Sequence, residues 1–436
     1  MRLGARFILI LYLLVPIASA QKRAGGKAPS LEPEKLIALK VTGTTRYTDK
    51  EILAASGLQL GQNAADGDFR EAARRLGDSG LFSDVVYTYT SSGAGVKLEL
   101  QLADVDASKL VPSNFENFVW FTDAELLSEL KRRVPLFNGK VPLGGKLPDE
   151  LQEALQAVLD ERRIPARVDY LRETPQEGGA IVGISYSVES AEIRIRNVDF
   201  TGATPALVPG LQSASRPLTG APYRRTSLAK VAAVNFLPVC LKEGYLKASF
   251  GDTEARVVSQ SEGEFEVDVV QPVTLGKQYL VSATEWKGNS AIATSEVAPL
   301  LHLTTGQPAD AVRLGRDIEN VSKLYRSRGY MAVQVKPDAQ FDENKSSVHY
   351  DVNVAEGDLY KMGELEINGL DTQAKARMQE AWKLREGQPY NADYPKKFLD
   401  DTRQLLPRGL QWAISVHETP DAKDKTVDVE IRFKQQ

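Results

Sequence analysis

The sequence contains very little cysteine and histidine, and each shortage excludes a class of site. The single cysteine, Cys240, allows no intrachain disulfide. It lies in an apolar segment, which predicts a small buried core residue rather than a reactive thiol. The three histidines are dispersed, and none has a cysteine or a second histidine at ligand spacing, so we expect no metal site and no cofactor. They are His302, His349 and His417.

Long apolar runs are absent except at the N-terminus. There, two arginines precede an apolar run that ends in Ala18-Ser19-Ala20. A charged start, a short apolar core and small final residues predict a secretory signal peptide at residues 1–20, with an uncleaved anchor as the alternative. Residues 21–35, rich in glycine, proline and charge, predict a flexible linker. No other stretch approaches the roughly 18 apolar residues of a membrane span, so we expect no transmembrane helix in the mature chain.

The formal net charge is weakly negative. It is −4 for the whole chain, and removal of Arg2 and Arg6 with the signal peptide takes it to −6. Because nucleic-acid-binding domains are basic, we expect no nucleic acid partner. Hydrophobic residues make up 42% and charged residues 26% of the chain. These proportions are typical of globular proteins.

Two glycine-containing segments resemble functional motifs without fitting them. Gly77-Asp78-Ser79-Gly80 is similar to the nucleophile motif of serine proteases, but the same kind of turn recurs elsewhere without a serine. Residues 139–146 are similar to a phosphate loop, but Leu147 stands where serine or threonine is required. No acidic pair is placed for general acid–base work. We therefore predict that the protein is not an enzyme.

A helix, a glycine, an aromatic residue and a strand follow one another several times along the chain. At residues 320–337 the helix ends before Gly329, and Tyr330 begins an apolar, β-prone segment that we expect Pro337 to close. One helical face carries Leu314, Ile318, Val321 and Tyr325. The same pattern occurs at residues 76–89, 241–250 and 406–416.

Glycine spacing shows that these patterns belong to a longer repeat. In four places a glycine at a strand end is followed 18 residues later by a loop glycine, as in Gly288 and Gly306. The other pairs are Gly43 and Gly61, Gly202 and Gly220, and Gly369 and Gly387. Tight turns at these positions favour a positive φ, which glycine adopts without strain. Four equal spacings indicate a repeated unit.

A fifth unit, at about residues 110–190, departs from this pattern. Thr122 to Leu127 matches the capping-box segment Thr48 to Leu53. Asn117 replaces the strand-end glycine, and we expect it to adopt a positive φ, which asparagine tolerates better than most residues. Arg163-Ile164 stand where the glycine–aromatic pair is expected.

We therefore predict an α+β protein of five tandem β-α-α-β-β modules, each a three-stranded mixed sheet with two helices on one face. The predicted boundaries are 36–106, 109–190, 192–275, 278–357 and 360–436. Modules of this size have thin cores, so we expect packing against neighbours to contribute to their stability.

The repeated unit resembles a POTRA domain, the polypeptide-transport-associated domain. The residues that carry this resemblance in the first module are Val41–Gly43, Thr48–Leu53, Gly61, Leu76, Gly80–Val85 and Val96–Leu102. Five copies after a signal peptide are similar to the periplasmic part of BamA, of the surface antigen family. Members usually continue into a membrane β-barrel; because Gln436 directly follows the last strand, we expect a POTRA array that works with a separate barrel protein.

The resemblance implies a periplasmic scaffold for assembly or transport of outer-membrane proteins. The strand after the glycine–aromatic turn is the edge strand in such folds, and its backbone can pair with an extended chain by β-augmentation. The implied partners are unfolded outer-membrane proteins, a separate barrel protein, or both, with peripheral association at the outer membrane. The alternative is a structural adaptor that docks a barrel or envelope proteins without binding clients. The candidate edge residues are Val85, Val86, Tyr87, Tyr89, Lys247, Ala248, Phe250, Ala332, Val333 and Val335.

Overall fold

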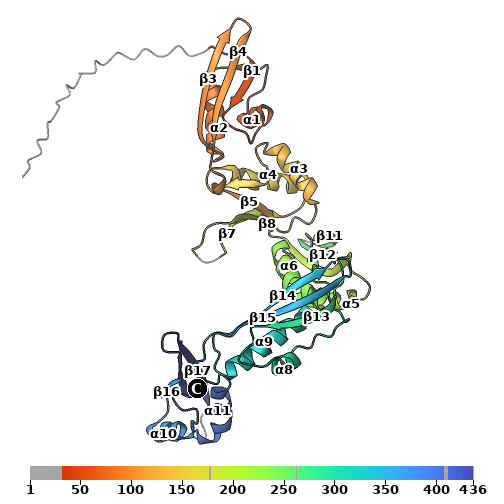
Figure 1. Ribbon diagram of the computed structural model, residues 1–436. Helices are drawn as coiled ribbons and strands as arrows, with labels where there is room; N and C mark the ends of the chain where they lie inside the picture. The colour runs from red at the N-terminus through yellow and green to blue at the C-terminus, as the bar shows by residue number, and fades with distance from the viewer. Residues whose placement is uncertain (1–31, 176–177, 262, 407–410, 436) are drawn as a thin grey trace, which may run out of the picture. The chain divides into compact units, whose positions relative to one another are not determined.

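The computed structural model describes residues 32–175, 178–261, 263–406 and 411–435 (Figure 1). The predicted signal peptide and most of the predicted linker lie outside the described residues. The chain forms two compact units. One comprises the described residues up to Asn114 together with Glu125–Arg162 and Tyr170–Ser185, and the other comprises Phe115–Ala124, Arg163–Asp169 and the described residues from Tyr186 onward.

The first module is a mixed sheet with two helices. Its elements are β1 (Glu34–Thr42), α1 (Asp49–Ser56), β2 (Asn63–Ala64), α2 (Asp66–Asp78), β3 (Phe82–Ser92) and β4 (Gly95–Asp104). The strand order is β2-β1-β4-β3, with β1 parallel and β3 antiparallel to β4. Alternate residues of β4 are at most 1% exposed, as their alternation with polar residues predicts: Val96, Leu98, Leu100 and Leu102.

The first strand begins earlier than the sequence predicts. Glu34 and Lys35 were assigned to the flexible linker, but they belong to β1 and pair with Ala64 and Asn63 of β2. The short strand β2 provides backbone partners beside the start of β1, and nothing in the local sequence indicates that pairing. The strand therefore starts at Glu34 rather than at Leu36.

Four further groups of elements follow in the chain. The second has η1 (Ala107–Lys109), β5 (Leu110–Phe115), α3 (Asp123–Arg133), β6 (Lys140–Pro142), α4 (Leu147–Glu161), β7 (Arg167–Glu173) and β8 (Gly183–Glu189). The third has β9 (Glu192–Thr201), α5 (Val208–Ser215), η2 (Arg216–Leu218), α6 (Arg225–Val231), η3 (Ala232–Phe236), α7 (Leu237–Lys242), β10 (Ser249–Phe250), β11 (Glu254–Ser261) and β12 (Glu264–Thr274). The fourth has β13 (Leu280–Lys287), α8 (Thr294–Val297), η4 (Ala298–Leu300), α9 (Ala311–Ser327), β14 (Gln334–Asp342) and β15 (Ser347–Ala355). The fifth has β16 (Lys361–Asn368), α10 (Thr372–Ala381), α11 (Tyr394–Thr402), η5 (Arg403–Leu405), β17 (Trp412–Asp421) and β18 (Thr426–Gln435).

The predicted α+β fold of β-α-α-β-β repeats is confirmed. In the third, fourth and fifth modules the first strand runs parallel to the closing strand, which lies between it and an antiparallel second strand. The orders are β9-β12-β11, β13-β15-β14 and β16-β18-β17, and the second module has the order β6-β5-β8-β7. The first three sheets also carry a short fourth strand, β2, β6 or β10, which the sequence did not predict. The module boundaries stay a prediction.

The strand-end glycines have the predicted positive φ, and the structure adds a second reason for glycine. Gly43, Gly202, Gly288 and Gly369 have φ angles of 86°, 84°, 82° and 87°. In each case a Cβ atom would collide with a backbone carbonyl of the closing strand, for example that of Val354 at Gly288. The loop glycine Gly306 has a φ of 80°, but a Cβ there would have nothing within 4 Å. The loop glycine is therefore needed for its positive φ alone, whereas the strand-end glycine is needed both for its φ and for the absence of a Cβ.

Asn117 does not adopt the positive φ that the sequence predicted. Among the described residues the non-glycine positive φ angles belong to Arg163, Ser190, Ser346 and Lys425. The Asn117 side chain instead bonds to the closing strand: its Nδ2 donates to the Val188 carbonyl at 3.0 Å, and its Oδ1 accepts from the Val188 N–H at 2.7 Å. The amide thus takes the place of a backbone partner. Arg163, at the expected glycine–aromatic position, has a φ of 56°.

Replacing Asn117 by alanine is expected to destabilise the second module by about 2 to 4 kcal/mol. Both backbone groups of Val188 would lose their partner in a buried place, and each unsatisfied buried group costs about 1–3 kcal/mol. Hydrogen exchange of the Val188 amide should accelerate most. Asn197→Ala is the control, because Asn197 is exposed and its side-chain amide donates to the exposed Asp199 rather than to a backbone group. Equal exchange at Val188 in both variants would contradict this role for Asn117.

The glycine of the helix–strand turn is a site of contact with the next module. Gly329 has a φ of 93°, and a Cβ there would lie 2.8 Å from the Tyr360 carbonyl oxygen and 3.2 Å from that of Tyr390. A Cβ at Gly244 would likewise lie 2.7 Å from the Tyr279 carbonyl oxygen. Tyr360 N–H also donates to the Gly329 carbonyl at 2.8 Å. The recurring turn therefore positions the first strand of the following module.

Two other sequence expectations concern the core and the membrane. Cys240 is fully buried, as predicted, and its pKa is raised because burial disfavours the thiolate. Among the helices that the structure describes, none has the combined length and apolar character needed to cross a lipid bilayer.

Candidate polypeptide-binding edges

Strand β3 lies at the edge of the first sheet, as the family resemblance implies. Among the described strands it pairs with β4 alone, and the pairing is regular from Asp84 to Ser92. Val86 is 45% exposed. Tyr87 and Tyr89 lie on the opposite face, against α2: the Tyr87 hydroxyl donates to Asp66 at 3.0 Å, and the Tyr89 ring lies 5.4 Å from that of Phe69. The helix thereby holds the edge strand in place.

The side chains of β3 do little to protect its edge. Natural edge strands are blunted by lysine, proline or bulges, because an open row of backbone N–H and C=O groups attracts another strand. β3 contains neither lysine nor proline, and its one irregularity, between Phe82 and Asp84, lies at its start. Among the described residues, the outer edge of β3 therefore lacks the usual side-chain protections against pairing with another strand.

The predicted edge in the third module is misplaced. Lys247 and Ala248 lie in a turn rather than in a strand, and Phe250 belongs to the two-residue strand β10, which pairs with the end of β12. Phe250 also packs against the core ring of Phe236, 5.9 Å away. The edge strand is β11, which begins later, at Glu254. The apolar residues of this segment suggested a strand, but Tyr245, Ala248 and Phe250 are apolar because they pack against the core of the third module.

Lys247 contacts the fourth module. Its ammonium bonds to Glu343 and lies 4.5 Å from the centre of the Phe341 ring. The hydrogen bonds from Lys247 and from Tyr279 lower the pKa of Glu343 to about 2. Because this carboxylate is fully ionised at neutral pH, the contact is a charged one. Lys247 therefore stabilises the contact between the third and fourth modules and does not lie on a free sheet edge.

In the fourth module the predicted edge begins too early. Ala332 and Val333 lie in the turn, whereas Val335 belongs to the edge strand β14 and is 9% exposed. Pro337 was predicted to close the strand, but it lies within β14 and pairs with Val352. Proline is tolerated there because an edge strand has one side without ladder bonds. Together with Lys336, it makes this edge a poorer template than β3.

The sequence pattern did not identify β11 and β17 as edge strands. β17 is regular along its whole pairing with β18, and proline enters only near its end, at Pro420. β11 is bulged between Val257 and Ser259. Near it, a cavity of about 280 Å³ is lined by Ala229, Leu237, Phe250 and neighbouring residues. Alternation was present in β17, but no sequence feature distinguishes an edge strand from a central one.

Residues 279–357 match the POTRA family model, described as surface antigen variable number repeat. The crystal structure of BamA POTRA3-5 from Haemophilus influenzae is 20% identical, with a TM-score of 0.44, and the match covers 56% of this chain and 96% of that one. The N-terminal domain of Omp85 from Thermosynechococcus elongatus is 20% identical, with a TM-score of 0.25 and coverage of 56% and 97%. CdiB from Escherichia coli is 16% identical, with a TM-score of 0.20 and coverage of 36% and 27%.

Proposed function

We propose that this chain, whose residues 279–357 form a POTRA domain within a series of related modules, is a periplasmic polypeptide-binding scaffold in the assembly or transport of outer-membrane proteins. Its clients are unfolded outer-membrane chains, which it binds by β-augmentation. The N-terminal signal pattern of the sequence supports export. The scaffold acts by binding and positioning chains rather than by catalysis.

The observation that carries this proposal is the open edge of β3. Backbone pairing along an edge strand is nearly independent of the client's sequence, since every residue except proline offers the same N–H and C=O groups. This property suits a module that handles many different barrel precursors. On the exposed face, Val86 adds one apolar side chain that a side chain of a bound strand can contact.

Site-specific photo-cross-linking tests the proposal. A cross-linker at Val86, 45% exposed on β3, is expected to capture unfolded outer-membrane chains in the periplasm. Leu127 on α3 provides the control, because it is 43% exposed but lies on a helix, which has no free ladder groups. Client capture at Val86 and not at Leu127 supports edge binding.

Two outcomes would count against it. Equal yields at both positions would indicate non-specific contact with unfolded chains. Capture at Val86 of a fixed set of folded envelope proteins, without precursors, would favour the adaptor function that the sequence left open.

A further inference from the structure

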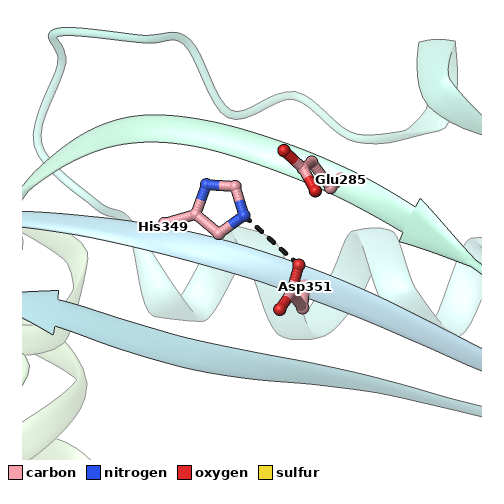
Figure 2. Close-up of side chains that lie close together, drawn as sticks. All are labelled: Glu285, His349 and Asp351. Carbon is pink, nitrogen blue, oxygen red and sulfur yellow. Dashed lines mark hydrogen bonds and ion pairs between the residues drawn. The ribbon is translucent and has the colours of Figure 1, made fainter.

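The exposed face of the sheet in the fourth module brings together one histidine and two carboxylates. Glu285 on β13 lies opposite Asp351 on β15, and His349 precedes Asp351 by two positions on the same face. Figure 2 shows the three side chains gathered on that face. One potential ligand atom from each lies within 4.8 Å of the others. Both strands are hydrogen-bonded in a regular ladder here, so the backbone holds these positions in a fixed relation.

Both oxygens of Asp351 have neighbours, and the two on Oδ2 lie outside the three-residue cluster. Its Oδ2 accepts from Lys287 Nζ at 2.8 Å and from Gln340 Nε2 at 2.6 Å. Its Oδ1 faces His349 Nε2 at 3.2 Å. The residue is 6% exposed, and Lys287 holds the pKa of its carboxyl below the usual value. Hydrogen bonds to the non-ligating oxygen are the outer-shell arrangement that orients carboxylates in metal sites.

Glu285 and His349 supply the other two ligand atoms, and a bound metal would replace the hydrogen bond between His349 Nε2 and Asp351 Oδ1. The Glu285 carboxylate is exposed, and we find no hydrogen bond or ion pair to it among the described residues. The His349 side chain is 25% exposed, and neutral imidazole binds a metal through Nε2. One imidazole nitrogen and two carboxylate oxygens suit a borderline divalent ion, with water in the remaining positions.

We propose that Glu285, His349 and Asp351 bind a divalent transition-metal ion of the Zn²⁺ class. The ion joins the first strand of the module to its closing strand. The sequence predicted no metal site because spacing rules detect ligands on one helix or hairpin, whereas these lie on two strands far apart in the chain. Lys287 is a positive charge beside the site, so affinity is lower than that of a four-ligand structural zinc site.

Spectroscopic titration of the untagged full chain with Co²⁺, followed by competition with Zn²⁺, tests the proposal. We expect one site per chain with visible absorption bands that Zn²⁺ abolishes. His349→Gln and Glu285→Gln should each weaken binding by at least tenfold. His302→Gln and His417→Gln are the matched controls and should bind as the original chain does.

His417 is a demanding control, because it lies opposite Glu430 on the sheet of the fifth module. There, however, Arg432 is bonded to the carboxylate of Glu430. No binding by the original chain, or equal loss of binding in the His349 and His417 variants, would overturn the proposal.

Thermal unfolding provides a second readout that does not depend on spectra. An ion that binds only the folded state raises its stability by mass action. Zn²⁺ should therefore raise the unfolding midpoint of the original chain and of the His417 variant, but not that of His349→Gln. Circular dichroism without metal confirms that each variant is folded. An equal Zn²⁺ effect on His349→Gln would contradict the site.

Discussion

Replacing Gly288 by alanine is expected to unfold the fourth module under conditions in which Gly306→Ala leaves it folded. Both glycines have nearly the same φ, 82° and 80°. The strain of placing an alanine in the left-handed region, roughly 1–2 kcal/mol, is therefore common to both variants. Only at Gly288 does the new Cβ also meet the backbone carbonyl of Val354.

The collision between the new Cβ and the Val354 carbonyl decides the outcome. Val354 belongs to β15, the central strand, which pairs on both sides with β13 and β14. The carbonyl cannot retreat without disturbing the ladder, and overpacking of this kind costs about 1–3 kcal/mol or more. A thin core leaves little reserve stability to absorb it.

Chemical denaturation with a local probe measures the difference. Trp286, on β13, reports unfolding of this module by fluorescence once the other three of the chain's four tryptophans are replaced by phenylalanine. The midpoint of Gly288→Ala should fall well below that of Gly306→Ala, which itself should fall slightly below that of the original chain. Coincident unfolding midpoints for the two variants would show that the positive φ alone, and not the collision with Val354, explains the need for glycine at position 288.

Gly329→Ala is expected to uncouple the fourth and fifth modules while leaving each folded. The added Cβ would lie 2.8 Å from the carbonyl oxygen of Tyr360 and 2.8 Å from Leu359 Cδ1. The leucine side chain can move, but the carbonyl belongs to the backbone that enters β16. Moving it would also break the hydrogen bond from Tyr360 N–H to Gly329.

Limited proteolysis and hydrogen exchange distinguish this result from global unfolding. Cleavage should accelerate in the connecting residues 356–360, and the Tyr360 amide should exchange faster. The control is Gly387→Ala, because Gly387 lies in the fifth module with a φ of 79° and open space around it. If the control produced the same cleavage, strain in the fifth module rather than the junction would be responsible.

Local sequence chemistry predicted the helices and turns well. The capping box at Thr48 and Glu51 is present, with each residue bonded to the other's backbone N–H. The helical face at Leu314, Val321 and Tyr325 is buried in α9. These features depend on residues three or four positions apart, so their physical cause is contained in a short stretch of sequence.

The strand boundaries were predicted less accurately where apolar residues pack against the core from a turn or a short strand. Tyr330 packs against Tyr325 at 5.9 Å in the turn before β14, although its aromatic character suggested a strand. In the same way, Phe250 serves the core of the third module. From the sequence of a short apolar segment, one cannot tell whether it packs against a neighbouring strand or against a helix. The tertiary structure determines which of the two it is.

The candidate sites depend most strongly on tertiary structure. The sequence placed Val85, Val86, Tyr87 and Tyr89 in a strand, but the lack of a second neighbour for that strand follows from sheet order. The grouping of Glu285 with His349 follows from the parallel pairing of β13 with β15. Neither fact has a local signature.

By itself, the sequence determined the repeat, the fold class and the repeat glycines that need a positive φ, because periodicity, capping and glycine conformation are properties of neighbouring residues. The tertiary structure decided which glycines also require the absence of a Cβ, why Asn117 can replace one of them through its side chain, and which strands remain at an edge. Those properties arise from backbones that approach one another across long sequence separations, and no local pattern encodes such an approach.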